Sequence, residues 1–155
     1  GLIEDRFEEI ITPKVESYGC TVLKSIIVPD ELLTVKRGVQ ELIASGCDLI
    51  VTTAGLSVDP EDLTRQGLIE AGAEQMLYGA PILPGAMTLL ARINSVQILG
   101  VPACALFFKN TSFDLLLPRL LADLQINRSD LAAMGHGSMC HECTKCTFPK
   151  CWFGK

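Results

Sequence analysis

Four cysteines in the last sixteen residues are the side chains with the clearest chemistry. Cys140, Cys143, Cys146 and Cys151 are separated by two, two and four residues. Two-residue gaps allow successive thiolates to wrap around one metal, and four thiolates complete a tetrahedral zinc site or hold an iron–sulfur cluster. Three cysteines spaced in this way favour an iron–sulfur cluster over structural zinc, whose ligand pairs are usually separated by a longer loop. A redox disulfide within the tail is the alternative to metal binding.

The histidines and the remaining cysteines have simpler interpretations. His136 and His141 lie near the cluster, where a histidine is more often a surface residue or an outer hydrogen-bond partner than a ligand. Cys20, Cys47 and Cys104 are scattered among apolar residues, and a buried cysteine there behaves as a small hydrophobic side chain. We therefore assign metal binding to the four cysteines of the tail.

The second candidate site is a strand, a turn and a helix start between Asp48 and Thr64, with the sequence DLIVTTAGLSVDPEDLT. It places Thr52 and Thr53 at the carboxyl end of the strand and an acidic helix start at Asp59. In open α/β sheets ligands bind at this edge, and the free N–H groups of a helix N-terminus bind phosphate. The same turn also occurs where no ligand binds, and there an aspartate only caps the helix.

The stretch TTAGLSVDPEDLT resembles the TTGG and D-V-T signature of the molybdopterin-binding fold. Molybdopterin adenylyltransferases, molybdenum insertases and CinA-type proteins share this signature. VPDE at 28–31, PILPGAM at 81–87 and GVPACALFF at 100–108 extend the resemblance. It covers residues 1–127 and starts just after the point where the first strand of the family would end.

The resemblance implies a set of site residues. Asp62 matches the aspartate that the family uses near the pterin phosphate and metal, and Asp30 matches its acidic partner. The two would form a catalytic pair or hold Mg²⁺. The resemblance also implies a group that binds the cofactor: Thr52, Thr53, Gly55, Ser57, Asp62, Pro84, Gly85 and Pro102. Both aspartates also lie at predicted helix starts, where a carboxylate stabilises the helix dipole whatever the function.

Three turns depart from the family pattern. Ala54 stands where the signature has its first glycine, and a methyl group there limits how closely backbone and ligand approach. The turn at 83–87 lacks the lysines of the family's KPGKP turn, and Ala103 and Cys104 replace a Gly-Asn pair. An acidic site with few cations favours binding of a pterin over catalysis. Three basic residues are candidates to compensate: Arg65, Arg92 and Lys109.

These residues must be positioned by an α/β fold. Apolar runs alternate with amphipathic ones in βαβ order, which predicts three layers: a mostly parallel sheet with helices on both faces. Strands are predicted at 20–28, 48–53 and 96–101, and a weaker one at 75–78. Helices are predicted at 1–19, at 31–45 after an Asp30 N-cap, at 59–71, at 111–124 with a kink at Pro118, and at 129–134 with Ser129 as the cap.

Two units are expected along the chain. Residues 1–127 form the molybdopterin-binding-like domain, which lacks its first strand and is therefore expected to be a piece of a longer protein. Residues 128–155 form a short helix and the cysteine-rich, metal-binding tail. This tail cannot build a core of its own, so a metal or contact with the domain must hold it.

Length and composition narrow the class of protein. The 155 residues, 48% of them hydrophobic, can bury one core. The net charge of −5 argues against nucleic acid as a partner, because too few cations are present to neutralise a run of phosphates. The apolar run at 103–108 is too short to span a membrane. We expect a cytoplasmic protein with a small-molecule partner, and the family resemblance implies a homo-oligomer.

Three functions remain open at this point. The favoured one is binding of molybdopterin, its adenylylated form or the molybdenum cofactor, in biosynthesis, handling or delivery to a molybdoenzyme. The second is an enzyme of the same fold, a Mg-dependent nucleotidyl transferase or a CinA-like nucleotide hydrolase. The third is a redox or interaction domain that works through its four-cysteine metal site. The sequence leaves open whether the chain is an enzyme.

Overall fold

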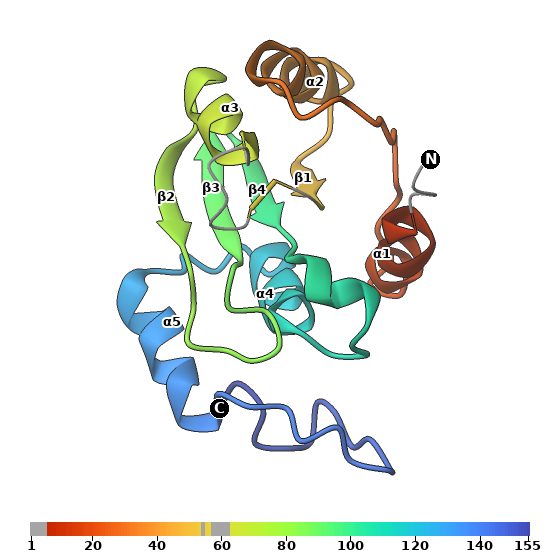
Figure 1. Ribbon diagram of the computed structural model, residues 1–155, viewed down its shortest axis with the longest axis vertical. Helices are drawn as coiled ribbons and strands as arrows, with labels where there is room; N and C mark the ends of the chain where they lie inside the picture. Colours follow the sequence, from red (N-terminus) through yellow and green to blue (C-terminus); the bar gives the residue numbers. More distant parts are fainter. Residues whose placement is uncertain (1–5, 54, 57–62) are drawn as a thin grey trace.

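Short apolar runs form a four-stranded sheet, drawn as arrows in Figure 1, a ribbon of the computed structural model. The strands are β1 (Leu49–Thr52), β2 (Glu74–Tyr78), β3 (Leu89–Ile93) and β4 (Val96–Gly100), and their order in the sheet is β1-β4-β3-β2. β1 runs parallel to β4, whereas β3 pairs antiparallel with both β4 and β2. The structure describes residues 6–53, 55–56 and 63–155, and the predicted cap Asp59 lies outside them.

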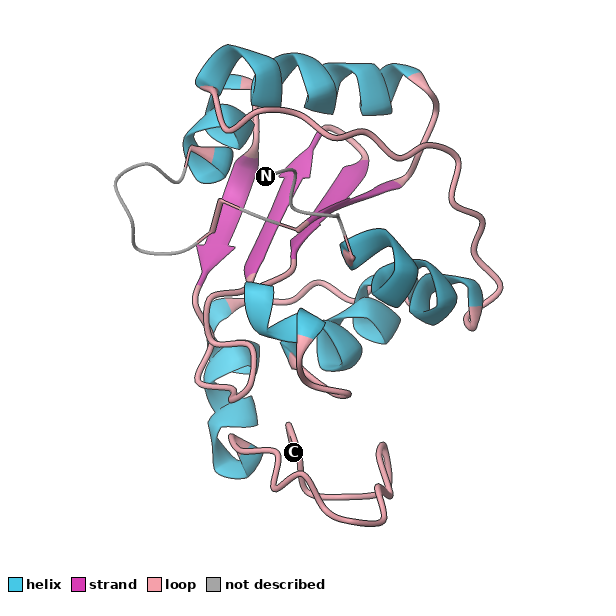
Figure 2. Cartoon of the chain, turned by 45° about the vertical axis from the view of Figure 1, so that its right-hand side comes forward, coloured by secondary structure: helices cyan, strands magenta, loops and turns pink. Residues whose placement is uncertain are grey.

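Helices cover both faces of this sheet, so the expected α/β class is confirmed, with a mixed rather than a mostly parallel sheet (Figure 2). α2 (Leu32–Ala44) and α3 (Thr64–Glu70) lie over one face. α1 (Phe7–Glu16) and α4 (Ser112–Leu121) lie over the other. The remaining elements are α5 (Arg128–Ala133) and two short 3₁₀ helices, η1 (Ala103–Leu106) and η2 (Met134–Gly137). None of the described helices is long and apolar enough to cross a lipid bilayer.

The two faces of the sheet bury separate apolar clusters because side chains alternate along a strand. Ile50 of β1 and Ile98 of β4 pack with Val39 of α2. On the opposite face, Leu99 of β4 packs with the helices α1 and α4, and Phe113 lies in this cluster with its side chain fully buried. The sheet is therefore a fixed platform whose strand ends position the turns that follow them.

Two predicted helix caps are wrong. Glu31, not Asp30, is the N-cap residue of α2, and the Asp30 carboxylate instead accepts a hydrogen bond from the N–H of Leu63 at 3.3 Å. Asn127, not Ser129, caps α5. Its side chain accepts hydrogen bonds from the N–H groups of Ser129 and Asp130, and the Asp130 carboxylate completes a capping box.

The strand predicted at 20–28 is absent, and β3 was not predicted. Residues 20–28 are extended but pair with no strand among the described residues, since a cavity of about 530 Å³ separates this segment from β1. A strand needs a neighbour to satisfy its N–H and C=O groups, and apolar character alone does not supply one. The predicted strands at 48–53, 75–78 and 96–101 are confirmed as β1, β2 and β4.

The C-terminal tail is attached to the domain at two places. The N–H of Leu83 donates to the carbonyl of Ser138 at 2.6 Å, and the N–H of Cys140 donates to the carbonyl of Leu83 at 2.8 Å. Near the end of the chain, the Phe153 side chain is 2% exposed and joins the apolar cluster of α1 and α4. The intervening segment, which contains Cys143 and Cys146, lies at the surface.

Candidate functional site

A cavity of about 720 Å³ lies where the carboxyl ends of β1 and β4 meet. Because these two strands are parallel, the residues that follow them share one edge of the sheet. Thr53 and Gly55 follow β1, and Pro102 follows β4. All three line the cavity, together with Pro84 and Gly85 of the turn after residue 82. Five residues implied by the family resemblance are thus brought together around one cavity.

The turn at Pro84 and Gly85 is held against the start of α4. The N–H of Ser112 donates to the carbonyl of Pro84 at 3.1 Å. Gly85 has a φ of +118°, and a Cβ built on it would overlap the hydroxyl group of Ser112. Only glycine meets both requirements without strain. At Gly85 the turn therefore presents its backbone to the cavity.

Thr52 lies at the last position of β1, directly before the cavity-lining Thr53. Its carbonyl accepts the N–H of Val101 at 2.7 Å, which joins the two strand ends. Its hydroxyl oxygen is buried and has no hydrogen-bond partner among the described residues. A buried hydroxyl without a partner costs free energy, although Thr52 itself does not line the cavity.

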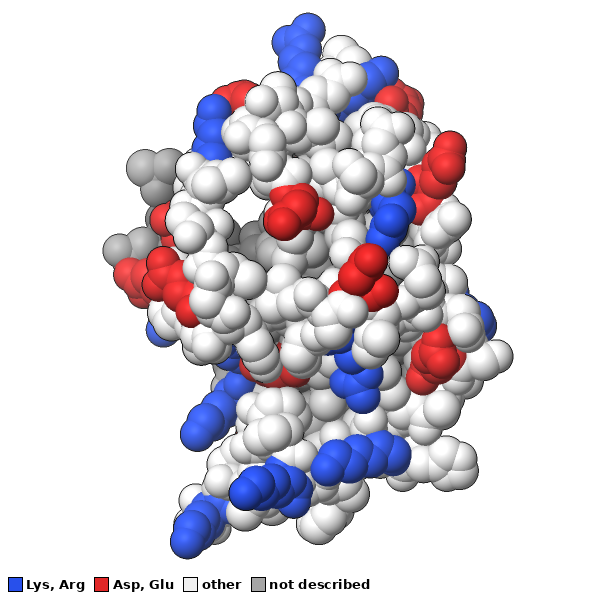
Figure 3. All heavy atoms as spheres, turned by 180° about the vertical axis from the view of Figure 1, so that it is seen from behind, with Lys and Arg blue, Asp and Glu red and all other residues white. Residues whose placement is uncertain are grey.

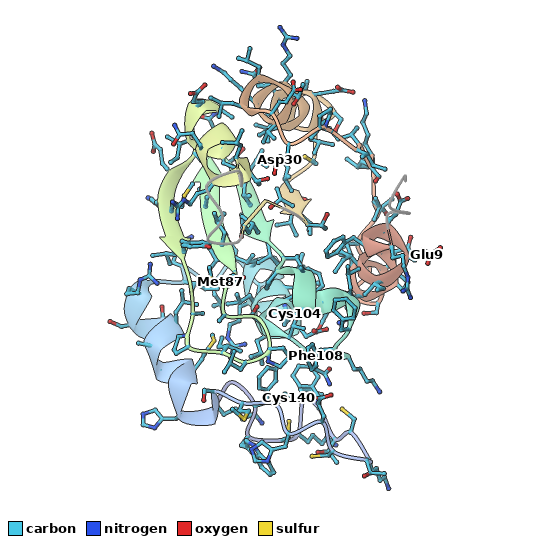
Figure 4. All side chains as sticks on the ribbon, in the orientation of Figure 1. Glu9, Asp30, Met87, Cys104, Phe108 and Cys140 are labelled. Carbon is cyan, nitrogen blue, oxygen red and sulfur yellow. The ribbon has the colours of Figure 1, made fainter. Side chains whose placement is uncertain are left out.

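Of the predicted carboxylate pair, Asp30 lies among the described residues and Asp62 does not. Asp30 is exposed and does not line the cavity, and its carboxylate lies against the N–H of Leu63. Ser57 and Asp62 lie outside the described residues. Figure 4 shows Asp30 beside α2, apart from Met87, Cys104, Phe108 and Cys140, which are grouped between the sheet and the tail. The roles of Asp30 and Asp62 as a pair stay predictions.

The three candidate cations have other positions. The guanidinium of Arg65 lies 4.8 Å from the ring centre of Tyr78. Arg92 pairs with Asp123 at 3.7 Å. Lys109 lines a different cavity, next to the tail. Among the described residues that line the large cavity, the only charged side chain is that of Glu142.

Cys104 contributes a neutral thiol to the cavity. It belongs to η1 and is partly buried. Burial raises the pKa of the Cys104 thiol, because the interior disfavours the charged thiolate. At neutral pH this side chain is therefore a small apolar lining group rather than a nucleophile.

Several lining residues were not found from the sequence. They come from the segment after β1, from the turn at 83–87, from the segment after η1 and from the tail: Leu56, Met87, Phe108, Met139, Cys140 and Glu142. A partial signal exists for Phe108, because an aromatic pair directly follows η1. Nothing in the local pattern indicates that residues 139–142 return to the edge of the sheet.

A second cavity, of about 270 Å³, is lined by all four cysteines of the tail. The amide of Asn110 donates to the sulfur of Cys146 at 3.2 Å. Hydrogen bonds from the N–H of Phe148 and from the Asn110 amide lower the pKa of the Cys146 thiol. Within the described residues no three His, Cys, Asp or Glu side chains stand close enough to hold a metal ion. The metal site therefore stays a prediction at this point.

The tail also differs in charge from the opposite end of the molecule. It carries three exposed lysines: Lys145, Lys150 and Lys155. On the face seen in Figure 3, Lys and Arg side chains gather at the end formed by the tail, whereas Asp and Glu side chains are more frequent above it. The cysteine segment thus lies in a basic surface on a chain with a net negative charge.

Comparison with known proteins gives three findings. Residues 1–122 match the family model described as "Probable molybdopterin binding domain". A CinA-like protein from Petrotoga mobilis is 32% identical over 71 residues, which are 46% of this chain and 17% of that protein, so this chain spans only a small part of it. The crystal structure of the molybdopterin biosynthesis enzyme MoaB from Thermus thermophilus matches with a TM-score of 0.65 and 20% identity, over 78% of this chain and 83% of that one. The last match shows the fold alone.

Proposed function

The chain belongs to the molybdopterin-binding domain family, and on this premise we propose that it binds molybdopterin, its adenylylated form or the molybdenum cofactor in the 720 Å³ cavity. One observation carries the proposal. Thr53, Gly55, Pro84, Gly85 and Pro102, which the resemblance singles out, line this single cavity at the carboxyl edge of the sheet.

The cavity fits a pterin in size and in chemistry. Small-molecule sites usually have volumes of roughly 300–1,000 Å³ with mostly apolar walls and a few polar groups. Here Met87, Pro102 and Phe108 supply apolar surface for a flat ring. The Thr53 hydroxyl and the turn backbone supply hydrogen bonds.

Binding and handling of the cofactor is favoured over catalysis. Phosphoryl transfer needs cations or Mg²⁺ to neutralise the charge that develops on phosphate oxygens. None of the described lining residues is Lys or Arg, and Asp30 is not part of the lining. The hydrogen bond from Leu63 nevertheless keeps Asp30 near the residue that follows Asp62, so a Mg-dependent nucleotidyl transferase or hydrolase is the second candidate.

The role in the cell belongs to the same proposal. A protein that binds the cofactor without transforming it would carry it during biosynthesis or deliver it to a molybdoenzyme. We also propose a homo-oligomer, and a metal held by the cysteine tail as a zinc ion or an iron–sulfur cluster. The family membership supports the pterin ligand, and the cysteine spacing supports the metal.

Calorimetric titration of the reduced protein with molybdopterin under anaerobic conditions tests the proposal. We expect a dissociation constant in the micromolar range or below. Thr53→Val removes one hydroxyl from the cavity and should weaken binding by about 1 kcal/mol, or roughly fivefold. Ala103→Trp should abolish binding, because Ala103 is exposed at the cavity and an indole there would fill it.

The matched control is Thr12→Val, which makes the same chemical change on α1, away from the ligand cavity. This variant should bind like the unchanged protein. Absence of binding by the intact reduced protein would overturn the proposal. Release of pyrophosphate from MgATP in the presence of molybdopterin, abolished by Asp62→Ala, would instead favour the transferase.

A further inference from the structure

The cysteine tail forms a loop that is closed at its base. The N–H of Gly154 donates to the carbonyl of Gly137 at 2.8 Å, so residues 137 and 154 meet. The two segments that meet at this base approach so closely that a Cβ on Gly137 would overlap the carbonyl oxygen of Trp152. All four cysteines lie between these two closing residues. The loop therefore holds its thiols in one region before any metal binds.

The four thiols surround one cavity without yet converging on one point. Cys143 and Cys146 are exposed, so little packing opposes a small movement toward the other two. Cys140 and Cys151 are partly buried and contact the main apolar cluster. Asn110, which is buried at the start of the α4 segment, already donates a hydrogen bond to one of the sulfurs. An amide directed at a thiolate is the outer hydrogen bond that supports metal–sulfur coordination.

The cysteine cavity and the ligand cavity share a wall. Phe108, Cys140 and Glu142 line both of them. Cys140 is also joined through its N–H to the carbonyl of Leu83, next to the Pro84–Gly85 turn of the ligand cavity. A change in the position of Cys140 therefore acts on both cavities at once.

We propose that Cys140, Cys143, Cys146 and Cys151 bind one metal centre, and that this centre fixes the shared wall and thereby controls ligand binding in the neighbouring cavity. The control of ligand affinity rests on the proposed binding of a pterin, whereas the metal centre rests on the cysteine spacing and the cavity that the four cysteines line. Without metal, residues 139–142 are held by the bridge to Leu83, by the packing of Cys140 against the apolar cluster and by the contact of His141 with Trp152, and no bond joins Cys140 to the exposed thiols. With metal, Cys140 is fixed from both sides. Such coupling is reciprocal, so the ligand also tightens metal binding.

Metal binding is tested first, by titrating the reduced protein with Co²⁺. One equivalent should give the charge-transfer and d–d absorption of a tetrahedral cobalt thiolate site. Cys143→Ser should lose these bands, and since Cys143 is exposed the variant should fold normally. Cys47→Ser is the matched control, because Cys47 lines the 530 Å³ cavity and not the cysteine cavity, and it should leave the titration unchanged. Competition with Zn²⁺ and anaerobic reconstitution with iron and sulfide then distinguish a zinc site from a cluster.

The coupling has a readout that needs no pterin. Cys104 lines the ligand cavity but not the cysteine cavity, so its alkylation rate at alkaline pH, where its thiolate forms, reports on how open the ligand cavity is. Metal should slow the alkylation of Cys104 at least about fivefold, the lower end of typical coupling. In Cys143→Ser the same metal concentration should change nothing. An unchanged rate in the metal-loaded protein would overturn the coupling.

Molybdopterin titration with and without metal completes the test. We expect affinity to rise by at least about fivefold on metal loading in the intact protein and not in Cys143→Ser. Equal affinity in both states would overturn the control of binding. If metal protects Cys104 but the protein binds no pterin, the coupling through the shared wall is supported and the proposal that the ligand is molybdopterin is overturned. The two proposals can therefore be distinguished. Absence of cobalt thiolate bands in the intact protein would overturn the metal centre itself.

Discussion

The thiols of Cys104 and Cys146 lie in opposite environments. Burial raises the pKa of the Cys104 thiol. The N–H of Phe148 and the amide of Asn110 lower the pKa of the Cys146 thiol by hydrogen bonding to its sulfur. The thiolate is the reactive form of cysteine, so a lowered pKa leaves more thiolate at neutral pH and a raised pKa leaves less.

We predict that iodoacetamide at pH 7 modifies Cys146 well before Cys104 in the reduced, metal-free protein. As the pH falls, Cys146 should stay reactive to a lower pH than an ordinary cysteine, because its lowered pKa keeps the thiolate form populated at that pH. Cys104 should become reactive only as the pH rises above the range of an ordinary thiol. A time course of peptide masses after digestion measures all the sites together. Equal rates at the two cysteines would contradict the prediction.

The residue types of three turns were sufficient to predict part of the lining of the ligand cavity. Thr53, Gly55 and Gly85 stand in turns whose sequence resembles a known signature, and all three line the cavity. Met139 and Glu142 belong to no such turn. Their place in the wall depends on how the tail folds back, which is a tertiary property that no local pattern contains.

Among the elements, those with a local cause were predictable. Thr111 caps α4, and Asp114 completes its capping box, so the start of this helix is encoded within four residues. The hairpin of β3 and β4 has a weaker signal, the Asn94–Ser95 pair between two apolar runs, with Asn94 at a φ of +53°. Asparagine adopts such a φ more readily than most residues, and a two-residue turn of this kind marks a hairpin.

The stability of α5 depends on its N-cap residue, Asn127. Asn127→Ala removes the acceptor for the N–H groups of Ser129 and Asp130 and should lower the free energy of unfolding by about 1 kcal/mol. Ser129→Ala should change it by less than about 0.5 kcal/mol, since this side chain is exposed and is not the cap. Urea unfolding followed by circular dichroism compares the two. A larger loss from Ser129→Ala would place the cap where the sequence pattern first suggested it.

The arrangement of the whole molecule explains why 20–28 is not a strand. The segment has the apolar composition of a strand, and Val22 and Leu23 are exposed beside the 530 Å³ cavity that separates it from β1. Pairing depends on a neighbour at the right distance, and the described chain places none there. A sequence pattern predicts the capacity to form a strand, whereas the completed sheet decides whether the hydrogen bonds are made.

The packing of the whole molecule also shows that the tail is part of the core rather than an appendage. Leu131, Met134 and Phe153 belong to the apolar cluster that α1 and α4 form with the sheet. The aromatic ring of Phe153 is 2% exposed, while that of its neighbour Trp152 is 55% exposed and contacts His141 edge to face. The last residues of the chain are therefore packed into the domain through Phe153, with the partly buried Phe148 and Cys151 against the same cluster.

Phe153→Ala should consequently destabilise the whole molecule, by about 3–5 kcal/mol, because it leaves a cavity in the main core. Trp152→Ala, its immediate neighbour, should cost less than about 1 kcal/mol, because the indole is largely in water. Both variants are compared by urea unfolding of the metal-free protein, with tail and sheet followed separately by hydrogen exchange. If the tail is part of the core, Phe153→Ala shifts a single transition that both regions share. A separate, earlier loss of protection in the tail, with the sheet unaffected, would show instead that the tail folds on its own and that Phe153 anchors nothing beyond it.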